Sequence, residues 1–296
     1  MNARRTGLFA LGLLAIFLAA VGIGSAVEPA DTESGGEGHG MEAEAHGSHE
    51  EPANHAPAGL AVSEAGYTLR LDRTFFQEGE PSELRFTVTN ATGDPITAFD
   101  ELHERRMHLI VVRRDGTGFR HLHPELDAEG AWSIPVEFAE PGVYRAFADF
   151  SAGGEQHTLA GDLFVSGGEF EARPFPAPAL VDKTDGYDVH LHADDMQAGR
   201  RASLTFALSK GGEPVEDLAP YLGAKGHLVA LREGDLAYLH VHPEEGGGHG
   251  HGGQSAGHDE IAFAATFPTA GRYRLYLQFK HGGTVHTSEL TVEVPR

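Results

Sequence analysis

The sequence predicts an all-β protein made of two tandem β-sandwich domains. Short segments in which apolar and polar residues alternate recur along the chain, and Gly, Pro, Asn and Asp separate them. No long segment with a 3.6-residue apolar period follows residue 27, which argues against helices. A pattern of apolar, turn and histidine residues also occurs twice at an offset of 119 residues, and a length of 296 residues accommodates two such repeats.

The first sandwich is expected to span 66–166. Its predicted strands are 67–71, 84–89, the hairpin that begins at 107, 132–138, 145–150, 156–159 and 163–165. The stretch 96–106 is expected to be a long loop. Tyr144 follows a Pro-Gly turn at the start of a late strand, where immunoglobulin-like sandwiches carry a tyrosine corner. This position predicts an immunoglobulin-like arrangement.

The second sandwich is expected to span 185–296. Tyr187 matches Tyr67, and Tyr273 matches Tyr144 at an offset of 129 instead of 119. The ten extra residues fall in a loop rich in Gly and His at 246–258. Residues 167–184 contain three Pro and are expected to be a stiff linker.

Each repeat predicts a β-hairpin that gathers three histidines on one face. In the first repeat, a turn at Asp115-Gly116 makes paired residue numbers sum to 231, so His108 opposes His123. His121 lies two residues before His123 and therefore points to the same side. In the second repeat, a turn at Gly234-Asp235 gives a sum of 469. The corresponding three residues are His227, His240 and His242.

These imidazoles predict one metal ion in each domain. Opposed Cβ atoms in a hairpin are about 5 Å apart, which lets the ring nitrogens converge. The order expected for the strands in the sheet would add His157 in the first domain and His286 in the second. The chain contains no Cys, and only Met41 and Met107 are near any His in the sequence, so Cu(II) or Zn is expected rather than Cu(I).

The remaining histidines are expected to be auxiliary or structural. Residues 27–65 form a segment rich in Gly, Glu and His that is expected to be disordered, either a spacer or a weak metal-collecting tether. The weak candidates in that segment and in the Gly-rich loop are His39, His46, His49, His55, His249, His251 and His258. His103, His190 and His192 lack a histidine counterpart in the other repeat and are expected at the surface.

Residues 1–26 carry two Arg and then an uncharged apolar run, which indicates a signal peptide or an N-terminal membrane anchor. The protein is therefore expected to be exported, either secreted or held in the cell envelope. With 44 acidic and 22 basic residues the net charge is −22, which argues against nucleic-acid binding and against binding to anionic lipid. Contact with the membrane is expected only through 1–26.

The segment 218–243, best extended over 213–294, resembles a block found in exported bacterial proteins described as heavy-metal-associated or cupredoxin-like. The resemblance implies metal handling in the cell envelope and a cupredoxin-like sandwich. The expected function is non-enzymatic binding of copper or zinc for buffering, delivery or resistance, with a membrane metal transporter as a further partner.

Two alternatives remain open at the level of sequence. One is a cupin-type metalloenzyme, in which Glu125 or Glu129 would join the His-x-His pair, although Pro124 and Pro243 directly follow the two pairs. The other is an extracellular interaction or scaffold module in which the histidines are incidental.

Overall fold

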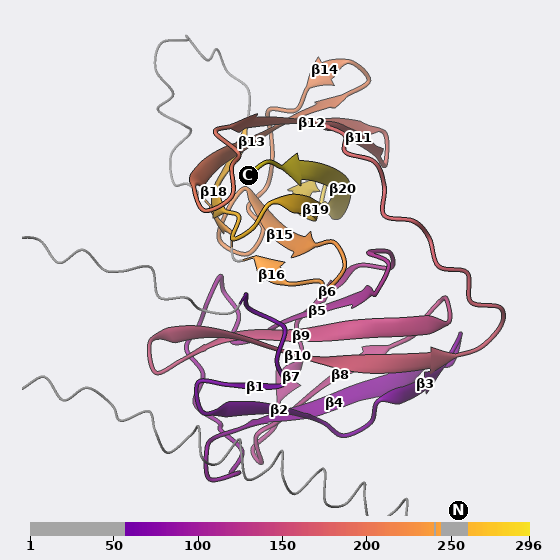
Figure 1. The fold of residues 1–296 in the computed structure, drawn as a ribbon, viewed down its shortest axis with the longest axis vertical. Coiled ribbons are helices and arrows are strands. Elements are labelled where there is room, and N and C mark those ends of the chain that lie inside the picture. The colour runs from indigo at the N-terminus through magenta and orange to yellow at the C-terminus, as the bar shows by residue number, and fades with distance from the viewer. Residues whose placement is uncertain (1–56, 240, 244–259) are drawn as a thin grey trace, which may run out of the picture. The chain divides into compact units, whose positions relative to one another are not determined.

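A computed structural model describes residues 57–239, 241–243 and 260–296. In these residues the protein consists of 20 strands and contains no helix, so the predicted all-β class is confirmed (Figure 1). None of the described residues forms a helix that could span a membrane. The predicted leader at 1–26 lies outside them.

The first domain is a sandwich of two five-stranded sheets, with strand orders β1-β2-β4-β8-β7 and β3-β10-β9-β5-β6. Its strands are β1 (Ser63–Glu64), β2 (Tyr67–Leu71), β3 (Phe75–Gln77), β4 (Ser82–Thr89), β5 (His108–Arg113), β6 (Arg120–Leu122), β7 (Glu125–Leu126), β8 (Ala131–Val136), β9 (Gly142–Ala152) and β10 (Glu155–Ser166). Alternation buries Leu84, Phe86 and Val88 between the sheets. The two short strands expected around Gly161 form one strand, β10. A Cβ at Gly161 would lie 2.8 Å from Leu71, so the missing side chain accommodates a close neighbour.

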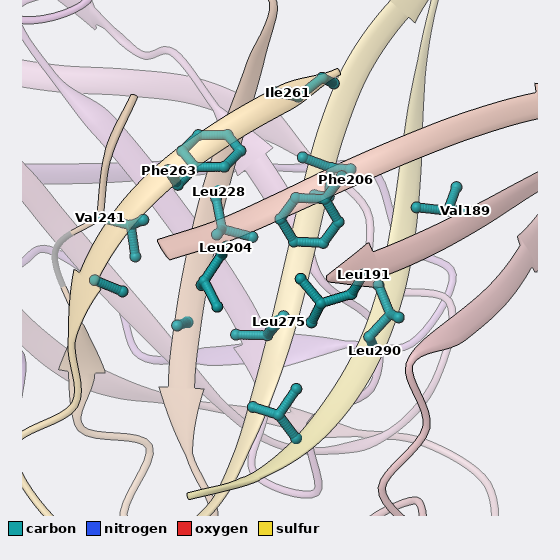
Figure 2. Close-up of a cluster of buried hydrophobic side chains, with 14 of the residues drawn as sticks. Val189, Leu191, Leu204, Phe206, Leu228, Val241, Ile261, Phe263, Leu275 and Leu290 are labelled. Carbon is teal, nitrogen blue, oxygen red and sulfur yellow. The ribbon is translucent and has the colours of Figure 1, made fainter. Parts of the chain in front are cut away.

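The second domain repeats this plan with sheet orders β11-β12-β13-β18-β17 and β16-β15-β19-β20. Its strands are β11 (Val181–Thr184), β12 (Tyr187–Asp194), β13 (Arg201–Lys210), β14 (Glu213–Pro214), β15 (Gly226–Arg232), β16 (Tyr238–Leu239), β17 (His242–Pro243), β18 (Ile261–Thr266), β19 (Gly271–His281) and β20 (Thr284–Val294). Figure 2 shows the buried side chains of this core, with Leu204, Phe206 and Phe263 from one sheet and Leu228 and Leu275 from the other.

Both predicted tyrosine corners are present. The Tyr144 hydroxyl donates to the Glu140 carbonyl at 2.9 Å, and the Tyr273 hydroxyl donates to the Thr269 carbonyl at the same distance. Each ring is almost fully buried. These hydrogen bonds fix the turns that precede β9 and β19, and they support the immunoglobulin-like assignment.

Two predicted boundaries need correction. The disordered segment was expected to reach residue 65, but residues 57–65 belong to the first domain, because Arg145 donates to the carbonyls of Gly59 and Leu60 at 3.1 and 2.9 Å. Residues 27–56 lie outside the described residues. The linker was expected to end at residue 184, but β11 begins at Val181 and pairs with β12.

The register of both hairpins is as predicted. Ile110 pairs with His121, which gives the sum of 231, and Ala230 pairs with Leu239, which gives 469. The strands are shorter than expected, because β6 ends at Leu122 and the chain then crosses to the opposite sheet as β7. Pro124 lies within that crossing, where a residue that cannot donate to a ladder is tolerated.

The two domains pack against each other through the outer faces of the sheets that contain β5 and β15. One buried cluster contains apolar side chains from both domains: Ile110, Val112 and Phe147 of the first, and Val229, Leu231, Leu236, Tyr238 and Tyr276 of the second. We call this contact the seam. Polar contacts also cross it: the Tyr276 hydroxyl donates to the Gly116 carbonyl at 2.7 Å, and Arg114 donates to the Asp235 carbonyl at 3.4 Å. All six residues of β5 are therefore buried, on both faces of the strand.

The seam is built symmetrically from equivalent residues of the two repeats. The ring of Phe119 stacks on Tyr276 at 4.1 Å, and the ring of Tyr238 contacts Phe147 at 5.6 Å. Tyr238 is the counterpart of Phe119, and Tyr276 is the counterpart of Phe147. Equivalent surfaces that contact each other in this reciprocal way are typical of a twofold interface.

Candidate metal centre

Three histidines from both domains converge at one end of the seam. His108 on β5, His121 on β6 and His227 on β15 each offer a ring nitrogen, and these nitrogens all lie within 4.8 Å of one another. His108 and His227 are equivalent residues of the two repeats, and their rings stack at 5.3 Å with 16° between the planes. His108 is buried, and the other two are partly exposed.

Backbone and amide contacts orient two of these rings. The His108 Nε2 atom lies 2.9 Å from the Leu102 carbonyl, which can only accept, so Nε2 carries the proton. In the neutral ring Nδ1 then holds a lone pair, and it faces His121 Nε2 at 2.9 Å. The other nitrogen of His121, Nδ1, lies 2.7 Å from Oε1 of Gln278 on β19. A residue of the second domain thus positions a ring of the first.

The orientation of the Gln278 amide decides what the histidine pair can bind. With Oε1 on His121, Nδ1 donates, and the lone pairs of His108 Nδ1 and His121 Nε2 face each other, which requires a cation near both. With the amide turned over, Gln278 donates to His121 and His121 donates to His108, which satisfies all three groups without a cation. The first arrangement suits a metal-loaded site and the second suits a metal-free site at neutral pH.

The electrostatics keep these imidazoles neutral. Burial lowers the pKa of His108 and, together with neighbouring histidines, lowers the pKa of His121 and of His227 well below the ordinary value. A carboxylate lies nearby, because buried Asp149 is the cross-strand partner of His108 and accepts a hydrogen bond from Thr158 at 2.9 Å. Neutral imidazole is the form that binds metal.

Two further histidines adjoin the three. The ring of His123 lies 4.8 Å from His121 and 5.3 Å from His108, so the predicted first-domain triad is brought together. Its Nε2 atom is buried without a hydrogen-bond partner, and burial lowers the pKa of His123 to about 4. His103, expected at the surface, lies 5.2 Å from His227 and 6.2 Å from His108, measured between ring centres.

His157 and His286 lie away from the cluster, contrary to the expectation of a fourth ligand. His157 pairs with Phe150 on β9, whereas His108 pairs with Asp149. Neighbouring residues of a strand point to opposite faces, so His157 lies on the sandwich side of its sheet, where its ring contacts Tyr67 at 4.7 Å. His286 repeats this geometry on Tyr187 at 4.7 Å and also bonds to Asp185 at 2.8 Å.

One histidine of the second domain lies beside the first-domain histidines. The outer faces of the two hairpins meet, so His227 joins the histidines of the first domain in a shared cluster. His240 lies outside the described residues, and the side chain of His242 is not described, so the second-domain triad stays a prediction. The weak candidates at 39–55 and 249–258 also lie outside the described residues.

The cluster differs from a cupin site in its donor set. Within the part of the chain that the structure describes, the group contains imidazoles and no carboxylate. Glu125 and Glu129, the carboxylates that the cupin alternative would use, are exposed. The seam was not predicted from the sequence, although the continuous apolar run of β5 is typical of a strand buried on both faces.

Comparison with known proteins identifies a family and leaves activity open. A family model described as a domain of unknown function, DUF8832, matches residues 61–167 and again residues 182–296. No protein with a curated description matches the chain.

Solved structures give only distant similarity. They include the Escherichia coli adhesin FdeC (14% identity, TM-score 0.26, covering 79% of this chain and 65% of that one) and the Yersinia pseudotuberculosis adhesin InvE (14%, 0.24, 79% and 61%). A Salmonella alpha-2-macroglobulin mutant is similar at 14% identity and a TM-score of 0.28, covering 82% of this chain and 16% of that one. The chain thus spans less than two thirds of the length of each of these three, and we draw no functional conclusion from them.

Proposed function

We propose that this chain, which belongs to the DUF8832 family, holds one divalent transition-metal ion in the seam between its two domains and has no catalytic role. The proposal is carried by the convergence of His108, His121 and His227, whose candidate ligand nitrogens lie within 4.8 Å of one another. The lowered pKa of each ring and the unpartnered Nε2 of His123 support it, since all four rings are ready to bind a metal at neutral pH.

The donor set supports either Cu(II) or Zn as the ion. Imidazole is a ligand that both ions accept, and the chain contains no Cys that would favour Cu(I).

A role in buffering or delivery follows from the position of the site. The ligands come from two domains that are joined by a linker, so uptake of the ion tightens the seam and release loosens it. The leader-like sequence at 1–26 supports metal handling outside the cytoplasm, where a membrane metal transporter would be the partner. The protein would act on the ion itself and not on an organic substrate.

The test uses untagged protein without residues 1–26, titrated calorimetrically with Cu(II) and with Zn. We expect one tight site per chain, and we expect either His121→Ala in the first domain or His227→Ala in the second to abolish it. Two tight sites, of which each variant removes one, would instead support separate sites in the two domains.

Controls separate the seam from other histidines. His190→Ala changes an exposed strand histidine and should leave the tight site intact. Deleting 246–258 should lower only the number of weak sites, because ligands in a Gly-rich segment lose conformational entropy on binding. Loss of the tight site in the deletion variant, with both seam variants still binding, would overturn the proposal.

A further inference from the structure

A two-residue turn of unusual composition lies beside the cluster. Leu102 and Arg105 exchange backbone hydrogen bonds at 2.7 and 3.1 Å, and the residues between them, His103 and Glu104, have φ of 49° and 63°. Positive φ at both central positions is the pattern of a type I′ turn, which normally carries Asn-Gly or Gly-Gly. Two residues with full side chains occupy it here.

The second domain has the same turn without the histidine. Tyr221 and Ala224 exchange the corresponding hydrogen bonds, and Leu222 and Gly223 have φ of 55° and 77°. His103 is therefore the counterpart of Leu222 at the offset of 119. The turn geometry belongs to the fold, whereas the imidazole belongs to the first domain alone.

The turn of the first domain is tied to the cluster at two points. The Leu102 carbonyl accepts the hydrogen bond from His108 Nε2 at 2.9 Å, so the turn itself orients a proposed ligand. The His103 ring lies 5.2 Å from His227 and 6.2 Å from His108. His103 is partly exposed and Glu104 and Arg105 are exposed, which makes this turn the solvent side of the site.

We propose that His103 is a further ligand of the seam ion, held beside the other imidazoles by the type I′ turn and placed where the ion enters from solvent. This inference rests on the proposed function and adds one named ligand to it. An imidazole at the solvent side can bind an incoming ion before the inner rings do.

The test compares His103→Asn with Glu104→Gly in protein lacking residues 1–26. Asn tolerates positive φ and keeps the turn but supplies no imidazole, whereas Glu104→Gly relaxes the same turn and keeps His103. Each protein is loaded with one equivalent of Cu(II). X-ray absorption then counts the imidazoles per copper, and competition with a chelator gives the dissociation constant.

We expect His103→Asn to lose one imidazole per copper and to bind at least about tenfold more weakly, the lower bound seen for changes around metal ligands. Glu104→Gly should match wild type in both readouts. If His103→Asn keeps the wild-type imidazole count and affinity, the inference is overturned and the proposed function stands. If wild type takes up no Cu(II) at the seam, both are overturned. His103→Gly provides a second variant should the Asn protein not fold.

Discussion

Replacing Gln278 with Leu should weaken metal binding at the seam by about 10–100-fold, which corresponds to about 1.4–2.7 kcal/mol. The Gln278 amide is almost fully buried, and its Oε1 atom lies 2.7 Å from His121 Nδ1. Leu removes the acceptor that holds His121 with its Nε2 lone pair toward the ion. The same change leaves the buried Nδ1 atom of His121 without a hydrogen-bond partner, so metal-free protein should lose about 1–3 kcal/mol of unfolding free energy.

Gln278→Glu is the matched variant. A carboxylate can only accept the hydrogen bond from His121 Nδ1, so it fixes the tautomer in which Nε2 is free to bind metal. The variant should therefore bind the ion at least as tightly as wild type. The fold tolerates a carboxylate at this place, because Asp149 is the equivalent residue of the first domain and is buried. In metal-free protein the new charge should raise the pKa of His121 and make metal uptake more dependent on pH.

Calorimetric titration with Cu(II) at pH 7.5, with a competing chelator to bring the affinity into range, measures both variants. Urea denaturation of the metal-free proteins gives the stability change separately. Thr287→Val serves as a control, since the contact between Gln278 and Thr287 is long, at 3.4 Å, and contributes little. If Gln278→Leu binds within about threefold of wild type, which is less than 1 kcal/mol, the orienting role assigned to this amide is refuted.

Three further predictions follow from the fold and the cluster. The pKa of His123 is about 4 in the folded protein and about 6.5 in the unfolded chain. Its contribution to stability is therefore complete above pH 6.5 and is lost as pH falls toward 4, by up to about 3 kcal/mol. Urea denaturation of metal-free protein at pH 7.5 and 4.5 should show a smaller loss of unfolding free energy in His123→Gln than in wild type. Ile110→Ala in the seam and Leu204→Ala in the second core remove fully buried side chains, and each should lower the free energy of unfolding by about 2–5 kcal/mol. Only Ile110→Ala should also weaken Cu(II) binding. Equal effects of the two variants on binding would argue against a site in the seam. Tyr144→Phe and Tyr273→Phe remove the corner hydrogen bonds and should each lower the free energy of unfolding by about 0.5–1.5 kcal/mol without changing metal affinity.

The local structure of the protein could be derived from the sequence because it depends on local chemistry. Alternation marked the strands, and Asp115-Gly116 fixed the register of the first hairpin, which the pairing of Ile110 with His121 confirms. The position of Tyr144 after its turn identified the corner that its hydroxyl closes. Each of these features needs only a few consecutive residues or a repeated spacing.

The composition of the site was decided by tertiary packing. The strand β5 is apolar on both faces, and the sequence does not specify which surface covers the outer one. The second domain covers it, and for that reason His227 and Gln278 meet His121 instead of serving a separate site. His157 would face the cluster only if β10 were shifted by one residue against β9. In the structure His157 pairs with Phe150, whereas His108 pairs with the neighbouring residue, Asp149. A shift of one residue changes the face of the sheet on which a side chain lies, and only the assembled sheet fixes it.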